Sequence, residues 1–253
     1  MTPRTKAIMV VHYAGLPVRM DEIKKLGLPI IEDAAHAVDS KLDGRSCGTI
    51  GDIGIYSFDA VKNLTTGEGG GLTAQSPEHI QRARQLRYCG IGKSGFEASV
   101  NKARWWEYQI VDFFPKMLPN DIAASIGLAQ LKKLDAMQAR REQIWKTYQE
   151  EFRSVEWIVR PVNADPADRH SYFTYCIRVA SGKRDALAKH LYENGVYTTL
   201  RYHPLHMNPI YKSSAKLPVS ERLNEEALSL PIHPRLSEDD VTKIVGLIKA
   251  FRI

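Results

Sequence analysis

A short apolar stretch that leads into a glycine-rich turn with one lysine constrains this chain more than any other feature. Residues 53–58 are predicted to form a buried strand, and residues 71–74 a strand that returns beside it. Between them, Lys62 lies in a polar turn that runs to Gly70. Burial and neighbouring groups can lower the pKa of an amine held at the mouth of a strand, and an unprotonated amine can attack a carbonyl. Taken alone, however, a loop lysine most often points into water.

A second apolar stretch, residues 29–33, ends in a carboxylate and is followed three residues later by an imidazole. These side chains are Asp33 and His36. A pyridoxal phosphate (PLP) site needs a carboxylate that keeps the ring nitrogen protonated and a lysine that holds the aldehyde as a Schiff base. An acid at the end of an apolar strand is also costly to bury without a partner. Asp33 and Lys62 together therefore predict a PLP site.

The composition is that of an ordinary globular protein, and it narrows the choice of partners. The 253 residues are 43% hydrophobic and 25% charged, enough for a sizeable core. No apolar run is long enough for a membrane span, and the first residues do not resemble a signal peptide. The three cysteines lack metal-binding or redox spacing, so we expect free thiols, a cytoplasmic location and no metal site. The net charge of +6 fits an anionic ligand or a basic surface, and no motif supports nucleic-acid binding.

The second half of the chain is predicted to form a smaller unit. Asn120 is a good N-cap for an apolar helix over residues 121–131, and residues 132–152 carry apolar side chains at helical spacing between charges. In the first half of the chain, helices are also predicted over residues 20–29 and 77–87. In the second half, the other predicted elements are helices over residues 183–194 and 237–251 and strands over residues 171–179 and 196–202. We therefore expect one domain over residues 1–131, and a linking helix with a small C-terminal α+β domain over residues 132–253.

Five motifs resemble the DegT/DnrJ/EryC1/StrS family of sugar aminotransferases. They are Val11-His12-Tyr13-Ala14-Gly15, Glu32-Asp33-Ala34-Ala35-His36, the stretch from Ser57 to Gly70, the stretch from Asp121 to Leu131, and His203-Pro204-Leu205-His206. Any one of them is weak, but all five in this order, over nearly the whole chain, are specific. The resemblance implies an α/β fold, that of a fold-type I PLP-dependent transferase, with a mainly parallel sheet in a truncated large domain. In the family, about a hundred further residues, including the loop that grips the cofactor phosphate, precede the first strand seen here.

The resemblance also implies roles toward the cofactor. Lys62 is expected to form the Schiff base and then to act as general base for the proton shift, because it stands beside the carbon that loses the proton. Asp33 is expected to pair with the pyridine nitrogen, His36 to lie beside the ring oxygen, and Ser57 to contact the phosphate. Two plainer interpretations stay open: His36 as a core histidine bonded to backbone, and Ser57 as an ordinary strand serine.

Toward the substrate, the resemblance implies roles for Arg201, His203 and His206. In the family this loop reaches the pocket where the diphosphate of a nucleotide sugar meets basic groups. The alternative of comparable weight is a surface turn built around the His-Pro pair.

The function implied by the resemblance is transfer of an amino group, expected to come from glutamate, to a nucleotide-linked keto sugar by a homodimer in polysaccharide biosynthesis. Two alternatives are open. A truncated, non-catalytic family member could bind sugar nucleotide or serve as a dimer partner, although the retention of Lys62 and Asp33 argues against it. A PLP-dependent dehydrase of the same family would normally carry histidine at the lysine position, so Lys62 speaks against that alternative too.

Overall fold

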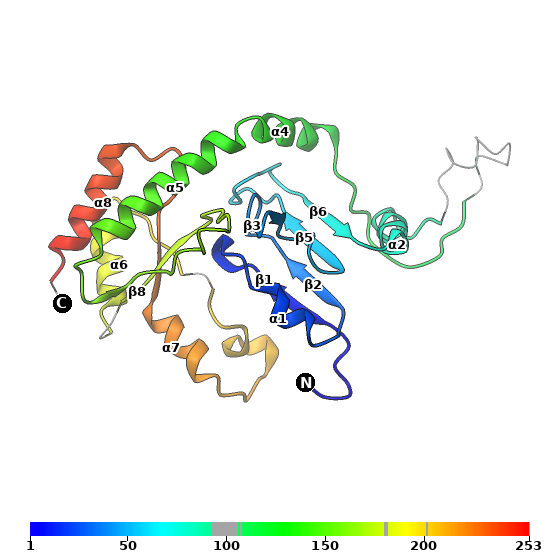
Figure 1. The fold of residues 1–253 in the computed structure, drawn as a ribbon, viewed down its shortest axis with the longest axis horizontal. Helices are drawn as coiled ribbons and strands as arrows, with labels where there is room; N and C mark the ends of the chain where they lie inside the picture. The colour runs from blue at the N-terminus through cyan, green and yellow to red at the C-terminus, as the bar shows by residue number, and fades with distance from the viewer. Residues whose placement is uncertain (93–105, 107, 180–181, 201, 253) are drawn as a thin grey trace. The chain divides into compact units, whose positions relative to one another are not determined.

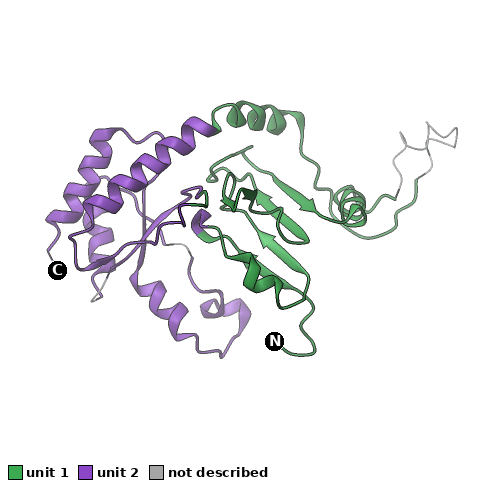
Figure 2. Cartoon of the chain, in the orientation of Figure 1, with its two compact units in different colours: residues 1–13, 17–134, 167–169 green, residues 14–16, 135–166, 170–253 purple. Residues whose placement is uncertain are grey.

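The computed structural model describes residues 1–92, 106, 108–179, 182–200 and 202–252. The chain divides into two compact units (Figure 2). Unit 1 comprises residues 1–13, 17–134 and 167–169, and unit 2 comprises residues 14–16, 135–166 and 170–253. None of the helices in the described ranges combines the length and apolar character needed to cross a membrane.

Unit 1 is built on a four-stranded sheet in the order β1-β2-β5-β6 (Figure 1). The first three strands, β1 (Ile8–Val11), β2 (Ile30–Asp33) and β5 (Ile53–Ser57), are parallel to one another. The fourth, β6 (Gly70–Ala74), returns antiparallel to β5. The predicted strand before Lys62 and its return strand are therefore confirmed, and so is the mostly parallel sheet of an α/β fold.

The remaining elements of unit 1 follow local sequence signals. They are α1 (Met20–Lys24), β3 (Lys41–Leu42), β4 (Arg45–Ser46), α2 (Pro77–Arg87) and α4 (Asp121–Leu131), and the 3-10 turn η1 (Tyr13–Gly15) spans both units. The Ser76 side chain caps α2, and the Asn120 side chain caps α4 by accepting the Ala123 N–H. The helix predicted over residues 20–29 was too long: α1 ends at Lys24, since Gly27 adopts φ 67° and Pro29 leads into β2.

The two faces of the unit 1 sheet differ sharply. On one face, which we call the covered face, Val10 pairs in register with Glu32 and Glu32 with Gly54, and all three residues are buried. Residues of α1, of β3 and of the turn before β5 pack here; the buried members of this cluster are Val10, Met20, Ile30, Leu42 and Ile50. The opposite face, which we call the open face, carries Met9, with 60% of its surface exposed.

Unit 2 is an α+β arrangement around a three-stranded antiparallel sheet, in the order β7-β8-β9. Its elements are α5 (Leu134–Glu151, whose first residue belongs to unit 1), β7 (Ile158–Val159), β8 (Tyr175–Val179), α6 (Arg184–Glu193), η2 (Leu205–Met207), η3 (Pro209–Tyr211), α7 (Pro218–Glu226), β9 (Ala227–Leu230) and α8 (Glu238–Ala250). The core packs β8 and β9 against α5, α6 and α8. At the start of α8, Ser237 and Asp240 form the capping box that the sequence indicates.

One predicted strand of unit 2 is wrong. Residues 196–202 were expected to form a strand, but in the described part of this stretch only Thr199 makes a bridge, to Ser229 on the outer edge of β9. A single bridge leaves the other described backbone groups of the stretch outside the sheet. The predicted strand over residues 171–179 is also shorter than expected, because only Tyr175–Val179 pairs with β9 and β7.

Candidate active site

Two of the predicted cofactor residues share the open face of the unit 1 sheet. In the parallel pair β2–β5, Asp33 stands opposite Ile55, so the side chains of both leave the sheet on the same side. Ser57 lies two residues beyond Ile55 and returns to that side. Asp33 and Ser57 are also the last residues of their strands. Both therefore lie at the carboxyl edge of the parallel strands, the edge at which α/β proteins bind their ligands.

The surroundings of Asp33 fit a cationic partner. The side chain is half-buried, and its Oδ1 accepts the N–H of Ala35 at 3.0 Å. Within the described residues no ion pair engages this carboxylate. A partly buried carboxylate that has one backbone hydrogen bond and no cation beside it can take the protonated ring nitrogen of PLP. The donor set at this position therefore fits the cofactor that the sequence predicts.

Lys62 lies in the connection between β5 and β6, half-buried. The connection is held by its own backbone: the Lys62 N–H donates to the Asp59 carbonyl at 3.0 Å, and the Thr66 N–H donates to the Phe58 carbonyl at 2.9 Å. The neighbouring Asn63 is buried. The loop is therefore a compact, hydrogen-bonded turn that begins at the same strand end as Ser57, and this turn is where an amine for the cofactor aldehyde was predicted.

His36 is almost completely buried in unit 1, three residues after Asp33. Its ring meets that of Tyr13 edge-on, with 5.8 Å between the ring centroids and 62° between the planes. An aromatic neighbour of this kind orients the imidazole. Contact between His36 and the cofactor stays a prediction.

Two of the predicted substrate residues, His203 and His206, lie beside α7 of unit 2. The Nδ1 of His203 is 3.2 Å from the Asn224 Oδ1, and the Nε2 of His206 is 3.1 Å from the Glu221 Oε1. His203 is exposed, whereas the His206 side chain is only 11% exposed. Hydrogen bonds to the Glu221 carboxylate, first from the Leu217 N–H and then from His206, lower its pKa. Arg201 lies outside the described residues.

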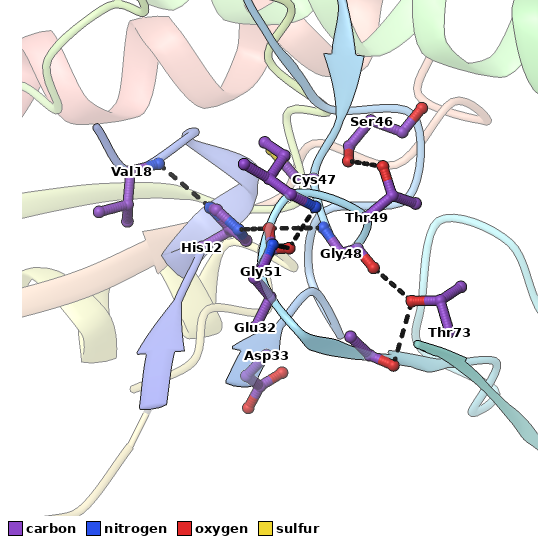
Figure 3. A network of polar contacts seen from close by, with 12 residues as sticks. His12, Val18, Glu32, Asp33, Ser46, Cys47, Gly48, Thr49, Gly51 and Thr73 are labelled. Carbon is purple, nitrogen blue, oxygen red and sulfur yellow. Dashed lines mark hydrogen bonds and ion pairs between the residues drawn. The ribbon is translucent and has the colours of Figure 1, made fainter. Parts of the chain in front are cut away.

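Glu32, next to Asp33 in unit 1, is a fully buried carboxylate with several hydrogen bonds, and no role was predicted for it (Figure 3). Its Oε2 accepts from the His12 Nε2 at 2.9 Å and from the Gly48 N–H at 2.8 Å. Its Oε1 accepts from the N–H groups of Ile50 and Gly51 at 2.6 and 2.5 Å. Burial by itself would raise the pKa of Glu32, but these hydrogen bonds outweigh burial and lower the pKa.

One signal in the sequence could have revealed this network. Glu32 and Asp33 are adjacent, and consecutive residues of a strand face opposite sides of the sheet. If Asp33 faces a ligand, Glu32 must then enter the core on the other side, where it needs several donors. The glycines at positions 48 and 51 are suited to a turn that brings backbone N–H groups close to such a carboxylate.

Comparisons with known proteins give one consistent result. A sequence model of the DegT/DnrJ/EryC1/StrS aminotransferase family matches residues 1–249. The chain is 38% identical over 249 residues to the dTDP-4-dehydro-2,3,6-trideoxy-D-glucose 4-aminotransferase of Saccharopolyspora spinosa; the match covers 96% of this chain and 65% of that protein.

Solved structures agree with the sequence matches. The aminotransferase TlmJ from Streptoalloteichus hindustanus superimposes with a TM-score of 0.89 at 40% identity, over 99% of this chain and 66% of that one. The Spr1654 protein of Streptococcus pneumoniae in its PMP form superimposes with a TM-score of 0.89 at 28% identity, over 98% and 70%. This chain thus spans about two thirds of the length of the proteins it matches.

Proposed function

Because the chain belongs to the DegT/DnrJ/EryC1/StrS aminotransferase family, we propose that it binds PLP and transfers an amino group to a nucleotide-linked keto sugar. The family is PLP-dependent, and the solved relative Spr1654 includes PLP and PMP forms. The observation that carries the proposal is the placement of Asp33 and Ser57 on one face of the sheet, at the carboxyl ends of adjacent parallel strands. The amine of Lys62 follows in the turn after the second strand.

When bound, PLP supplies an electron sink for the carbon that exchanges its proton and amino group. In this chain, Asp33 would hold the proton on the ring nitrogen, and a charge-assisted contact of this kind contributes roughly 1.5–3 kcal/mol. Lys62 would bind the cofactor aldehyde. When the substrate takes its place there, the free Lys62 amine would act as general base toward the carbon that loses the proton. Ser57 would donate its hydroxyl hydrogen to the phosphate, and His36 would lie beside the ring oxygen.

On the substrate side, the proposal names a nucleotide-linked keto sugar as acceptor and glutamate as donor. The Saccharopolyspora relative acts, by its name, on a dTDP-linked dehydro sugar. His203 and His206 would contact the substrate, together with Arg201. Apart from their hydrogen bonds to α7, the two histidines offer imidazole nitrogens of the kind that bind phosphate oxygens.

A homodimer in the cytoplasm is part of the proposal. In the chain that the structure describes, α4 has no buried residue, although most of its sequence is apolar. Ile122 and Leu128 of this helix are 77% and 64% exposed. A helix with this much exposed apolar surface is typical of a protein–protein interface. The three cysteines, Cys47, Cys89 and Cys176, are free thiols, which suits a reducing compartment.

The test is PLP binding and transamination by the chain and by Lys62→Ala. The unchanged chain should show a visible absorbance band on addition of PLP and should convert a dTDP-linked keto sugar with glutamate. Lys62→Ala should lose the band and lower turnover by roughly 10²–10⁴-fold, because the proton carrier is removed. Lys133→Ala, an exposed lysine of the same unit, is the matched control and should behave as the unchanged chain. An equal band in the Lys62→Ala variant would contradict the proposal.

A second candidate is a non-catalytic family member that binds sugar nucleotide or acts as a dimer partner. The exposed apolar side chains on the open face, where Asp33 and Ser57 lie, favour it. Sugar-nucleotide binding with no Lys62-dependent band and no turnover would favour this candidate over the first.

A further inference from the structure

Glu32 has no part in the chemistry proposed above, yet it ties three segments together beneath the candidate site. Its carboxylate is fully buried on the covered face of β2. The four donors to it come from His12, which follows β1, and from the turn over residues 48–51, which precedes β5 (Figure 3). One side chain therefore connects β1, β2 and the segment that leads into β5 on the covered face.

The hydrogen bonds around His12 have a fixed direction. The Val18 N–H donates to the His12 Nδ1 at 3.1 Å, so this nitrogen carries no hydrogen. The hydrogen of the neutral ring is then on Nε2, which donates to Glu32. Because all four groups around Glu32 are donors, the side chain must accept through both oxygens. A carboxylate can do this, whereas an amide would turn its NH2 group toward two donors.

The same histidine reaches Asp33. The backbone N–H of His12 donates to the Asp33 carbonyl at 3.0 Å, while its ring donates to Glu32. Asp33 is also the residue after Glu32, so a side chain fixed on the covered face directs the next one to the open face. On that side the Asp33 Oδ1 accepts the Ala35 N–H. Figure 3 shows the Asp33 side chain pointing away from the network around Glu32.

We propose that Glu32 is a positioning residue that, through His12 and the 48–51 turn, holds the Asp33 carboxylate in place for the pyridine nitrogen of PLP. The inference rests on the proposed function for the identity of that ligand. Its structural part, the coupling between Glu32 and the orientation of Asp33, does not depend on the ligand.

The first test compares two probes that differ only at the ring nitrogen, PLP and 1-deazapyridoxal 5′-phosphate. The deaza compound has a carbon where Asp33 would pair. Glu32→Gln should weaken PLP binding by about tenfold, the effect of disturbing one charge-assisted hydrogen bond, and should leave deaza-PLP binding nearly unchanged. Asp33→Asn should show the same selectivity, and the double variant should be no worse than Asp33→Asn alone. Equal losses for both probes in Glu32→Gln would overturn the proposal.

A matched control removes a different hydrogen bond from the same region. The Tyr56 hydroxyl donates to the Cys47 carbonyl at 2.6 Å, next to the turn that Glu32 holds. Tyr56→Phe should leave the affinities for both probes unchanged. If Tyr56→Phe shows the same PLP-selective loss, general loosening of the turn explains the effect and the role of Glu32 is wrong.

His12 provides a milder pair of variants in case Glu32→Gln does not fold. His12→Asn keeps an acceptor near the Val18 N–H but removes the donor to Glu32, whereas His12→Gln keeps a donor for Glu32. The Asn variant should show the PLP-selective loss, and the Gln variant should lie close to the unchanged chain. The reverse order would contradict the proposed coupling.

The second test needs no cofactor. Amide hydrogen exchange of Ala35 reports on the hydrogen bond to the Asp33 carboxylate. It should be about tenfold faster in Glu32→Gln than in Tyr56→Phe, corresponding to loss of one hydrogen bond. An unchanged rate overturns the positioning role whatever the ligand. If instead Asp33→Asn binds both probes alike while Ala35 exchange responds to Glu32→Gln, the proposed function fails and the positioning role holds.

Discussion

Two adjacent acidic residues, Glu32 and Asp33, lie on opposite faces of the unit 1 sheet and have different surroundings. On the covered face, Glu32 is fully buried and its carboxylate accepts four hydrogen bonds. On the open face, Asp33 is half-buried and accepts one from the backbone. A buried charge that is fully hydrogen-bonded stabilises one arrangement of the chain, whereas a charge with spare acceptor sites can bind a ligand. The face that each carboxylate occupies therefore decides whether it holds the fold together or is available to a ligand.

The backbone packing differs between the faces as well. On the covered face the turn over residues 48–51 lies directly against β5: a Cβ on Gly54 would overlap with the Gly48 carbonyl oxygen. The Thr73 hydroxyl of β6 donates to the same carbonyl. On the open face, Met9 and Leu72 are 60% and 46% exposed. Parallel strands are usually covered on both faces, so the open face is where a further contact is to be expected.

The largest expected effect on stability comes from truncating an apolar side chain on the covered face, compared with the same kind of change on the open face. Ile30→Ala, on the covered face, should lower the free energy of unfolding by about 2–5 kcal/mol, because a buried side chain leaves a cavity. Met9→Ala, on the open face, should change it by less than about 0.5 kcal/mol. Urea unfolding followed by circular dichroism measures both. Equal losses would mean that the open face is covered in solution.

An intermediate effect is expected where the covered face leaves no room for a side chain. Gly54→Ala should destabilise the chain by roughly 1–3 kcal/mol, because its Cβ can be accommodated only if the 48–51 turn moves. Gly246→Ala is the matched control, since its Cβ meets open space on the exposed side of α8. It should stabilise the helix by about 0.5–1 kcal/mol. Thermal unfolding of the two variants gives opposite shifts in Tm if the close packing is as observed.

A smaller effect is expected for the pH dependence of stability below pH 4.5, where Glu32 takes up a proton. Hydrogen bonding holds the pKa of Glu32 below its ordinary value of 4.5 in spite of burial, so the folded state binds its proton less readily than the unfolded state. This stabilisation is present above pH 4.5 and is lost as the pH falls through the lowered pKa. Urea midpoints measured from pH 7 downward should fall less steeply below pH 4.5 in Glu32→Gln. An unchanged acid slope would contradict an ionised Glu32.

Unit 2 contains a second acid-sensitive group, His170, whose contribution to stability begins to fall at a higher pH than that of Glu32. Burial lowers the pKa of His170 from 6.5 to about 4, so its contribution is complete above pH 6.5 and is lost as the pH falls toward 4. His170→Asn keeps an acceptor for the Tyr172 N–H and should flatten the pH dependence between 6.5 and 4. Comparing Glu32→Gln with His170→Asn separates the contributions of Glu32 and His170 to the pH dependence of stability.

Much of the fold could be predicted because it depends on local signals. The apolar stretches before Asp33 and Lys62 form strands, and Asn120 and Ser237 cap their helices as their sequences indicate. The errors lie where local signals compete with tertiary pairing. Residues 196–202 have strand character, but in the described part of this stretch only Thr199 pairs with the sheet, with Ser229 at the edge of β9. Strand character needs a partner over several residues before it becomes a strand.

In the candidate site, too, some features follow from local sequence and others depend on tertiary packing. The sequence alone determined that an acid and a lysine follow two apolar strands, because residue type and the lengths of apolar runs are local properties. Only the tertiary structure decided that Asp33 and Ser57 share a face while Glu32 enters the core. A strand alternates its side chains with a period of two, and which half of them is buried depends on the register with β1 and β5 and on the turn that packs beneath, which no single strand encodes.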